Sequence, residues 1–205
     1  MVSVILPALV GYFLGAIPAA YFLVRWKSNV DIRMAGSGNV GTLNSYQVTK
    51  SKAVGAVVLL VDLLKGILAV LVARTLDDQF LAHAASGVAA VLGHNFPVWL
   101  RFKGGRGLAT AAGVMIMLGW MFLPVWMIFW FVGFKISRDV NVGNAVGTIV
   151  MLVVAIFSPV DIISLTISPG TEAQHFTIFV GILSALILVR LVEPVKEFIN
   201  TKQGK

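Results

Sequence analysis

Long apolar runs separated by short polar stretches form the dominant pattern of this 205-residue chain. About 20 residues of helix cross the hydrocarbon core of a bilayer, and most of the runs approach that length. The clearest runs are Val2–Leu23, Ala53–Ala73, Phe80–Trp99, Val142–Phe157 and Phe176–Val189. The pattern predicts an all-α, polytopic membrane protein that forms a single integral-membrane domain over residues 1–205.

The stretch from Leu108 to Phe134 is longer than one crossing needs. As one helix it would extend about 40 Å, whereas a hydrocarbon core is about 30 Å thick. Gly119 and Pro124 offer a break near its middle. The alternative is therefore two segments, Leu108–Leu118 and Leu123–Phe134, of which the first is short for a full crossing.

The positive charges decide between these alternatives, because cytoplasmic loops of membrane proteins collect Lys and Arg. With the break, seven spans place on one side Arg25, Lys27, Arg33, Lys50, Lys52, Arg101, Lys103, Arg106, Lys135, Arg138, Arg190, Lys196, Lys202 and Lys205. Only Arg74 then lies on the other side, with Lys65 inside the membrane. An unbroken helix would move Lys135 and Arg138 outside. We expect seven transmembrane helices, an external N-terminus, a cytoplasmic C-terminus and an external loop over Ser158–His175, which contains Pro159 and Pro169.

Composition agrees with a membrane protein. Apolar residues make up 58% of the chain and charged residues 12%, whereas soluble domains carry about 25% charged residues. The net charge of +7 does not indicate nucleic acid, because the cations occupy short loops and form no separate basic domain. The chain has no cysteine, which excludes disulfides and Cys-ligated zinc. Arg25 and Lys27 follow the first apolar run, which favours a retained first helix over a cleaved signal peptide.

The polar stretch Gly36–Ser45 combines glycines with short polar side chains. Its G-x-G-x-x-G spacing is found in dinucleotide sites, but that motif must follow a strand in a soluble βαβ unit. Glycines also let backbone N–H groups converge on an anion. Hydroxyl and amide groups would assist, from Ser37, Asn39, Thr42 and Asn44. The alternative is an N-capping turn before the second apolar helix.

The connection Gly93–Thr110 holds a histidine, three cations and closely spaced glycines. Gly104-Gly105-Arg106-Gly107 directly precedes an apolar helix, so unpaired N–H groups and the positive end of the helix dipole would face a ligand. Lys103 and Arg106 would add charge-assisted hydrogen bonds, and Thr110 lies in the first turn. This predicts a phosphate site. The alternative, that the cations only set topology, does not explain the glycines.

His94 lies just before the glycine-rich part of that connection. It could act as a general base, because imidazole titrates near neutral pH. It could equally donate a hydrogen bond to a substrate or cap the third helix. No catalytic role is assigned to His83 or His175.

Two further polar groups remain. Asn141 and Asn144 are spaced i, i+3 and would share a helix face. With Arg138, this face could bind a polyol or phosphate; a plain helix cap is the competing account.

Asp62 and Lys65 have the same spacing inside the second span. Intramembrane charges are usually paired, so we expect an ion pair that shapes the floor of the site or the helix packing.

These motifs together resemble one known family. They are Ser37-Gly38-Asn39-Val40-Gly41 with Asn44, Asp62-x-x-Lys65-Gly66, Gly93-His94-x-Phe96-Pro97, and Phe102-Lys103-Gly104-Gly105-x-Gly107-x-Ala109-Thr110. They resemble the bacterial acyl-phosphate:glycerol-3-phosphate acyltransferases. The resemblance implies one acyltransferase domain with seven helices in the bacterial inner membrane and an active site facing the cytoplasm. It implies transfer of an acyl chain from acyl phosphate to glycerol 3-phosphate, giving lysophosphatidic acid and phosphate, the first step of phospholipid synthesis.

The resemblance also implies roles for residues. The catalytic candidates are His94, Ser37 and Asn39. The candidates for binding substrate and its phosphates are Gly38, Gly41, Asn44, Lys103, Gly104, Gly105, Arg106, Gly107, Thr110, Arg138, Asn141, Asn144 and Arg190. The donor has a good leaving group, so positioning and charge neutralisation can supply much of the catalysis. We expect no metal, no cofactor, no nucleic acid and no obligatory protein partner; the partners are the two substrates and the lipid bilayer.

The chain departs from the family pattern at several positions. Leu43 replaces a threonine, Gln47 an arginine, Arg106 a lysine, and Asn141 and Asn144 two serines; after Arg190, Leu191, Val192, Glu193 and Pro194 stand where His-Arg-x-Asn is expected. Several of these losses fall on residues that resemble the glycerol 3-phosphate side of the site. The alternatives are a divergent paralogue with another acceptor or no turnover and, less favoured, a transporter or channel.

Overall fold

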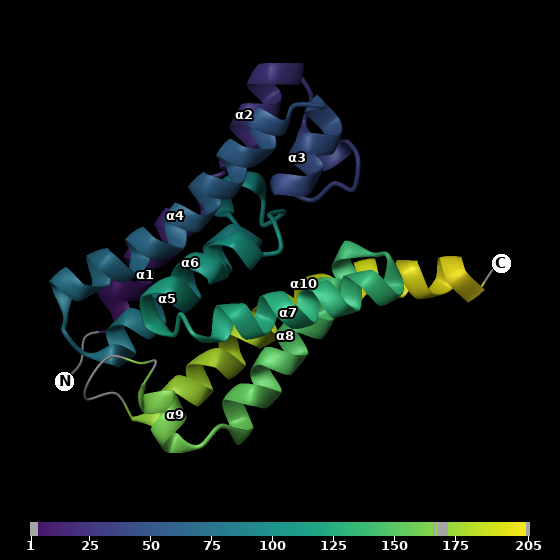
Figure 1. Ribbon diagram of the computed structural model, residues 1–205. Helices are drawn as coiled ribbons and strands as arrows, with labels where there is room; N and C mark the ends of the chain where they lie inside the picture. Colours follow the sequence, from purple (N-terminus) through teal and green to yellow (C-terminus); the bar gives the residue numbers. More distant parts are fainter. Residues whose placement is uncertain (1–3, 166, 168–171, 204–205) are drawn as a thin grey trace. The chain divides into compact units, whose positions relative to one another are not determined.

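The computed structural model describes residues 4–165, 167 and 172–203. Across these residues every regular element is a helix and no strand is present (Figure 1). Four stretches of helix are long and apolar enough to cross a membrane, namely Ile5–Ser28, Lys52–Leu76, Val140–Phe157 and Ala173–Lys202. The chain divides into two compact units, Met1–Met117 and Leu118–Lys205, and each is described separately.

The first unit contains six helices within its described residues, the last of which ends at the boundary. They are α1 (Ile5–Gly15), α2 (Ala19–Ser28), α3 (Thr42–Thr49), α4 (Lys52–Leu76), α5 (Phe80–Asn95) and α6 (Leu108–Leu118), with 3₁₀ turns η1 (Ile32–Met34) and η2 (Val98–Leu100). The first apolar run is broken, because Pro18 has no N–H to donate and α1 stops before it. Val2 and Ser3, where that run was expected to begin, lie outside the described residues.

Small residues bring α1 and α5 into close contact. Gly11 and Gly15 of α1 are four residues apart and therefore lie on one face. A Cβ at either position would overlap a backbone carbonyl oxygen of α5, that of Ser86 or Ala90. Gly93, one turn further along α5, meets the carbonyl oxygen of Tyr12 in the same way. This small-residue contact, common in membrane helix pairs, fixes the end of α5 that carries His94.

Small residues also bring α4 and α6 into close contact. A Cβ on Gly66 of α4 would overlap the Thr110 carbonyl oxygen, and one on Gly113 of α6 would overlap that of Leu63. Between α4 and α5, Ser86 Oγ donates a buried hydrogen bond of 2.8 Å to the Ala69 carbonyl oxygen. The polar residues of α4 are thereby held beside the end of α5 and the start of α6.

A small hydrophobic core supports the polar segment between α2 and α4. It consists of Ala20, Val24, Ile32, Val40, Val54, Val58 and Leu100. The core contains residues of α2, η1 and α4. It also contains one residue from each of the two polar connections, Val40 and Leu100. Helix α3, which the sequence analysis did not predict, lies within the same polar segment. Gly41 is its N-cap residue, and Ser51 Oγ caps α4 by accepting a hydrogen bond from Val54 N.

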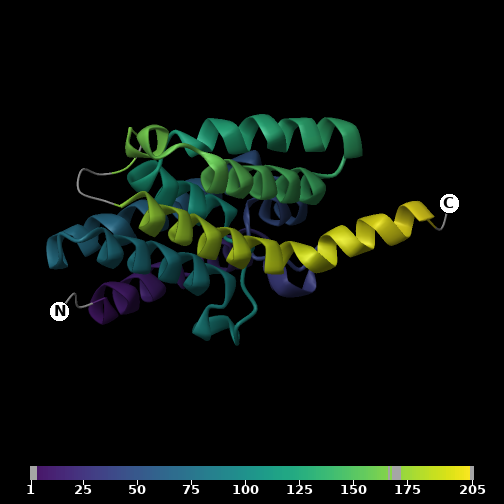
Figure 2. The same cartoon turned by 90° about the horizontal axis from the view of Figure 1, so that it is seen from below.

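The second unit contains α7 (Phe122–Ser137), α8 (Val140–Phe157), α9 (Val160–Ser164) and α10 (Ala173–Gln203). The break between α6 and α7 confirms the predicted pair of segments. Helices α7 and α8 pack closely, and Trp126 Nε1 donates to Thr148 Oγ1 at 3.1 Å. Helix α10 continues beyond the predicted end at Val189, with Pro194 inside it, and Figure 2 shows it bending towards its C-terminal end. The predicted loop Ser158–His175 contains α9; its Pro169, like the terminal Lys205, lies outside the described residues.

Candidate active site

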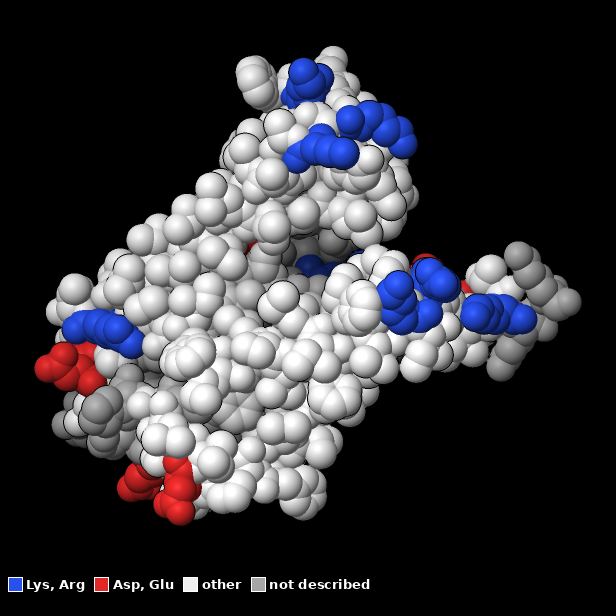
Figure 3. All heavy atoms as spheres, in the orientation of Figure 1, with Lys and Arg blue, Asp and Glu red and all other residues white. Residues whose placement is uncertain are grey.

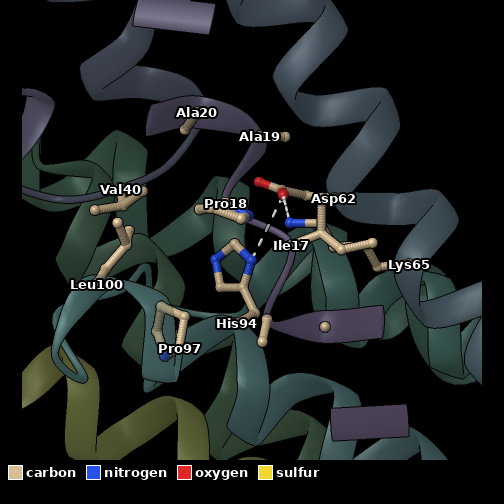
Figure 4. Close-up of a pocket in the computed structure, with 12 residues that line it drawn as sticks. Ile17, Pro18, Ala19, Ala20, Val40, Asp62, Lys65, His94, Pro97 and Leu100 are labelled. Atoms are coloured by element: carbon tan, nitrogen blue, oxygen red, sulfur yellow. Dashed lines mark hydrogen bonds and ion pairs between the residues drawn. The ribbon is translucent and has the colours of Figure 1, made fainter. Parts of the chain in front are cut away.

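The two glycine-rich stretches predicted to bind anions meet around His94 in the first unit. A Cβ on Gly105 would overlap His94 Nε2 and lie 2.7 Å from the carbonyl oxygen of Val40. Val40 belongs to the first stretch and Gly105 to the second. Figure 4 shows Val40 and Leu100 on one side of the imidazole and Asp62 with Lys65 on the other. Two stretches separated by more than 40 residues of sequence therefore form one site.

Asn44, on α3, organises the first stretch. Its Nδ2 donates to the carbonyl oxygens of Ile32, Ala35 and Asn39 at 3.0–3.3 Å, and its Oδ1 accepts from Ser37 N at 3.0 Å. The side chain is almost fully buried. Asn44 was predicted to contact substrate, but its amide is engaged within the chain. We therefore describe it as a positioning residue for Ser37 and Asn39.

Two positive backbone angles give the first stretch its shape. Gly36 has φ +58° and Gly38 has φ +69°, a region that glycine enters without steric cost. A Cβ on Gly36 would also overlap Asn44 Oδ1. The turn leaves Ser37 exposed and Asn39 half-buried. The alternative of a turn that caps the next long helix is not what the structure shows, because α3 intervenes and Ser51 caps α4.

The second stretch is attached to the last turn of α5. Gly105 N donates to the His94 carbonyl oxygen at 3.0 Å, and Gly104 N donates to that of Asn95 at 3.2 Å. The prediction that these two N–H groups face a ligand is therefore wrong. The glycines are needed for close approach instead: Gly107 has φ +76°, and a Cβ there would lie 2.6 Å from Asn95 Oδ1. Lys103 is exposed and Arg106 is half-buried, and the first turn of α6 follows them directly.

A buried charge cluster lies behind the two stretches. Lys65 Nζ is 2.6 Å from Asp62 Oδ1, which confirms the predicted ion pair. The same oxygen is 3.5 Å from His94 Nδ1 (Figure 4). All three side chains are less than 10% exposed. The cavity beside them has a volume of about 10 Å³, which is room for about one water molecule. No sequence pattern predicts that His94 joins the pair.

Thr110 is the remaining predicted residue of this unit. It lies in the first turn of α6 and is fully buried. Its Oγ1 has no hydrogen-bond partner among the described residues. Buried hydroxyl groups are normally paired, so this oxygen is a group that a bound ligand or water can satisfy.

The other predicted residues belong to the second unit. Asp139 is the N-cap residue of α8, and its Oδ1 accepts hydrogen bonds from Asn141 N at 2.8 Å and Val142 N at 3.0 Å. The helix-cap account of this stretch is therefore correct. Asn144 is buried in α8, and Arg138 is exposed at the end of α7. Arg190 is half-buried in α10. A binding role for these residues stays a prediction.

A larger hollow, which the sequence did not predict, lies beside Lys103. Its volume is about 430 Å³, and its lining is Asp31, Arg33, Met34, Trp99, Arg101 and Lys103. Arg33 bonds to Asp31 at 2.6 Å and to the Leu100 carbonyl oxygen at 3.3 Å. The hydrogen bond from Arg33 holds the pKa of Asp31 below its usual range. Arg33 and Arg101 were counted only as topology signals, and no sequence motif marks them as neighbours.

The family model described as glycerol-3-phosphate acyltransferase matches residues 5–201. The chain belongs to this family. The acyltransferase is 51% identical to the glycerol-3-phosphate acyltransferase of Myxococcus xanthus over 111 residues, which are 54% of this chain and 57% of that relative. It is 36% identical to the Thermotoga petrophila relative over 138 residues, 67% of this chain and 70% of that one.

A solved structure extends the similarity of the acyltransferase over nearly the whole chain. It is PlsY, an integral membrane glycerol 3-phosphate acyltransferase, in its glycerol 3-phosphate form. The TM-score is 0.79 at 28% identity, and the match covers 98% of this chain and 94% of that one. A second structure, of the lysophosphatidic acid form, matches with a TM-score of 0.78.

Proposed function

We propose that this acyltransferase transfers an acyl chain from acyl phosphate to glycerol 3-phosphate, giving lysophosphatidic acid and phosphate. The observation that carries the proposal is the meeting of Val40, Gly105 and His94, which joins two glycine-rich stretches at one buried imidazole. Both substrates carry phosphate, and the two stretches carry an exposed cation, Lys103, and an exposed hydroxyl group, Ser37. The solved relatives in glycerol 3-phosphate and lysophosphatidic acid forms support the same pair of ligands.

The reaction needs one bond made and one broken. The acceptor hydroxyl oxygen attacks the acyl carbon, and the bond from that carbon to the phosphate oxygen breaks, so phosphate leaves with the electron pair. The hydroxyl proton passes either to His94 or to the departing phosphate. Asp62 lies next to His94 Nδ1 and would keep the proton of the neutral ring there, leaving Nε2, the nitrogen beside Gly105, as the acceptor. Lys103 and Arg106 would neutralise charge on the leaving phosphate.

The proposed topology has seven spans, formed by α1 with α2, then α4, α5, α6, α7, α8 and α10, with the N-terminus outside and the C-terminus in the cytoplasm. In the first unit, Figure 3 shows most of the visible Lys and Arg gathered over the end that carries α2 and α3, whereas acidic side chains lie beside a smaller basic group at the other end. In the second unit, basic side chains gather towards the C-terminal part of α10 and acidic ones near α9. Both distributions favour an active site facing the cytoplasm of a bacterial inner membrane.

A second candidate function differs from the first only in the acceptor of the acyl chain. Leu191 is buried and apolar in α10, where the family pattern has a histidine, and Gln47 is exposed on α3, where the pattern has an arginine. Loss of one positive charge and one polar group from the acceptor side favours a paralogue that uses a different phosphorylated polyol. In both accounts acyl phosphate is the donor.

One assay separates these accounts. The purified protein in lipid nanodiscs is given acyl phosphate and either glycerol 3-phosphate or another phosphorylated polyol, and inorganic phosphate release is followed. Release that depends on glycerol 3-phosphate is the expected result. Release with another polyol alone would show that this polyol, and not glycerol 3-phosphate, is the acceptor. A folded protein that releases no phosphate with any acceptor would contradict the acyltransferase proposal.

A further inference from the structure

Helix α10 is longer than one membrane crossing needs. Its 31 residues would extend about 46 Å at 1.5 Å per residue, whereas a hydrocarbon core is about 30 Å thick. The final part, Leu191–Gln203, follows the predicted end of the last apolar run at Val189 and stays helical. We call this part the C-terminal arm. Beyond the span, the arm either extends into water or lies on the surface of the bilayer.

The C-terminal arm has one apolar face and one polar face. After the buried Leu191, its apolar side chains recur at helical spacing and therefore share one face; they are Val192, Val195, Phe198 and Ile199. The opposite face carries Glu193, Glu197, Asn200 and Thr201. Val192 and Ile199 are each 44% exposed, so the described residues leave the apolar face open.

This apolar face continues an exposed stripe of the preceding part of α10. Ile178, Ile182 and Val189 are exposed and are spaced i, i+4 and i+11, which is one side of an α-helix. Val192 extends the same stripe into the C-terminal arm. The stripe begins within a stretch long and apolar enough to cross a membrane, where an exposed apolar side faces lipid. The arm therefore carries a lipid-facing surface beyond the predicted span.

The charged side chains of the C-terminal arm are arranged around this face. Lys196 lies beside it and Lys202 at its end, and Lys202 Nζ is 5.1 Å from the centre of the Phe198 ring. The two glutamates lie on the polar face. Lysine stems can cover apolar surface while their ammonium groups reach lipid headgroups. Cations near the apolar face and carboxylates away from it are typical of helices that lie at a membrane interface.

The start of the C-terminal arm is also where α10 bends. Pro194 lies inside the helix, and Figure 2 shows the helix bending towards its C-terminal end. Proline has no N–H to donate and its ring clashes with the preceding turn, so it kinks a helix. Leu191, Val192 and Pro194 stand where the family pattern has polar residues. These departures therefore supply both the bend and the beginning of the apolar face.

A second copy of the chain is a weaker candidate for covering the apolar face. Helices that pair in water need apolar repeats sustained over at least about three heptads, and Leu191–Gln203 is shorter than that. Lys202 occupies the next position at which the apolar spacing would continue, and it ends the stripe. The lipid bilayer, to which the arm is already attached through the rest of α10, is the better match.

We propose that the C-terminal arm is an interfacial helix. It lies on the surface of the bilayer on the side where α10 ends, with its apolar face between the lipid headgroups and the start of the acyl chains. Its two lysines reach the headgroup phosphates, and its glutamates face water. The proposal concerns the second unit alone and rests on no step of the transfer reaction.

The test uses the absence of cysteine from the sequence. Ile199→Cys carries a single spin label on the apolar face, and Thr201→Cys carries a matched label on the polar face. The full chain is placed in nanodiscs of phosphatidylcholine and phosphatidylglycerol, and collisions of each label with oxygen and with a water-soluble nickel chelate are measured. We expect a several-fold higher oxygen-to-nickel ratio at position 199, because the apolar face of an interfacial helix is buried about 5–10 Å below the headgroups.

Two variants made in the Ile199→Cys background test the apolar face itself. Phe198→Asp adds a carboxylate to that face and should lower the ratio at position 199 to the value at position 201. Asn200→Asp adds the same charge to the polar face and should leave the ratio unchanged. Circular dichroism checks that the variants remain helical.

Three results would overturn the proposal. Equal ratios at the two positions, with free access of the nickel chelate to both, would place the arm in water. Spin–spin broadening that disappears on dilution with unlabelled chain, together with protection of position 199, would identify a second copy. An unchanged ratio after Phe198→Asp would exclude contact through the apolar face. The labels report only on the arm, so the phosphate-release assay of acyl transfer is decided separately.

Discussion

At the scale of single residues, the site depends on how little space surrounds His94. Gly105 touches the imidazole at Nε2, while Asp62 approaches it at Nδ1. The ring is thus held from both sides by groups on two different elements. Changes at either contact should therefore alter catalysis.

Gly105→Ala should lower the turnover number of acyl transfer by at least about tenfold, since a misplacement of about 1 Å in an active site can cost a hundredfold. The added methyl group would overlap His94 Nε2 and force the ring to move. Gly181→Ala is the control, because a Cβ there meets no atom within 4 Å. Steady-state phosphate release checks both variants, and equal activity in the two would contradict the contact.

Asp62→Leu should destabilise the protein by about 3–5 kcal/mol, because it leaves the Lys65 charge buried without its partner. The double variant Asp62→Leu/Lys65→Leu should recover most of the thermal stability, since no unpaired charge remains. Both variants should stay nearly inactive, because His94 loses its carboxylate. Melting temperature and phosphate release are measured together. A stable double variant with full activity would show that Asp62 has only a structural role.

At the scale of elements, some features follow from clear sequence patterns and others do not. The apolar runs, the break between α6 and α7, and the Asp62–Lys65 pair follow from hydrophobicity, helix length and i, i+3 spacing. Helix α3 could not be predicted in the same way, because it is mostly polar and short. Its stability comes from tertiary contacts such as those of Asn44, and these do not appear in a local pattern.

The roles of the loop glycines show a second limit of the sequence. Their spacing predicts an anion site, and the stretches that contain them do meet at His94. Their N–H groups at Gly104 and Gly105, however, bond to the end of α5. Glycine is found both where a backbone N–H faces a ligand and where it is hydrogen-bonded within the chain. The sequence alone therefore cannot distinguish the two cases. The hollow lined by Arg33 and Arg101 was missed because its cations come from two separate connections.

Asn44→Ala should raise the KM for acyl phosphate roughly tenfold or more through displacement of the first stretch. It also removes hydrogen bonds from three carbonyl groups and one N–H group, and each buried group left without a partner costs about 1–3 kcal/mol. Gln47→Ala, at an exposed position of the same helix, should change neither KM nor stability. Initial-rate kinetics and thermal unfolding distinguish the two, and similar values for both variants would contradict the positioning role.

At the scale of the whole molecule, the proposed seven spans include helices of very different lengths. The four longest stretches are sufficient by length. Helix α6 has 11 residues and would extend only about 16 Å, so a crossing there must be completed by the glycine-rich connection before it. The distribution of cations favours this short crossing.

The absence of cysteine from the sequence allows a clean topology test. Single cysteines are introduced as Lys50→Cys, Trp120→Cys and Lys135→Cys, and cells are treated with a membrane-impermeant maleimide before or after lysis. We expect labelling of Trp120→Cys in intact cells and of the two lysine positions only after lysis. The unmodified chain is the blank. Labelling of Lys135→Cys in intact cells would exclude the seven-span arrangement.

The attachment of Gly104 and Gly105 to α5 also has a dynamic consequence. Their amide hydrogens are bonded to the carbonyl oxygens of Asn95 and His94, so they can exchange with solvent only when the connection separates from the last turn of α5. Opening of the connection therefore requires both hydrogen bonds to break. If the connection moves as one unit, the rates of hydrogen–deuterium exchange at Gly104 and Gly105 should rise together.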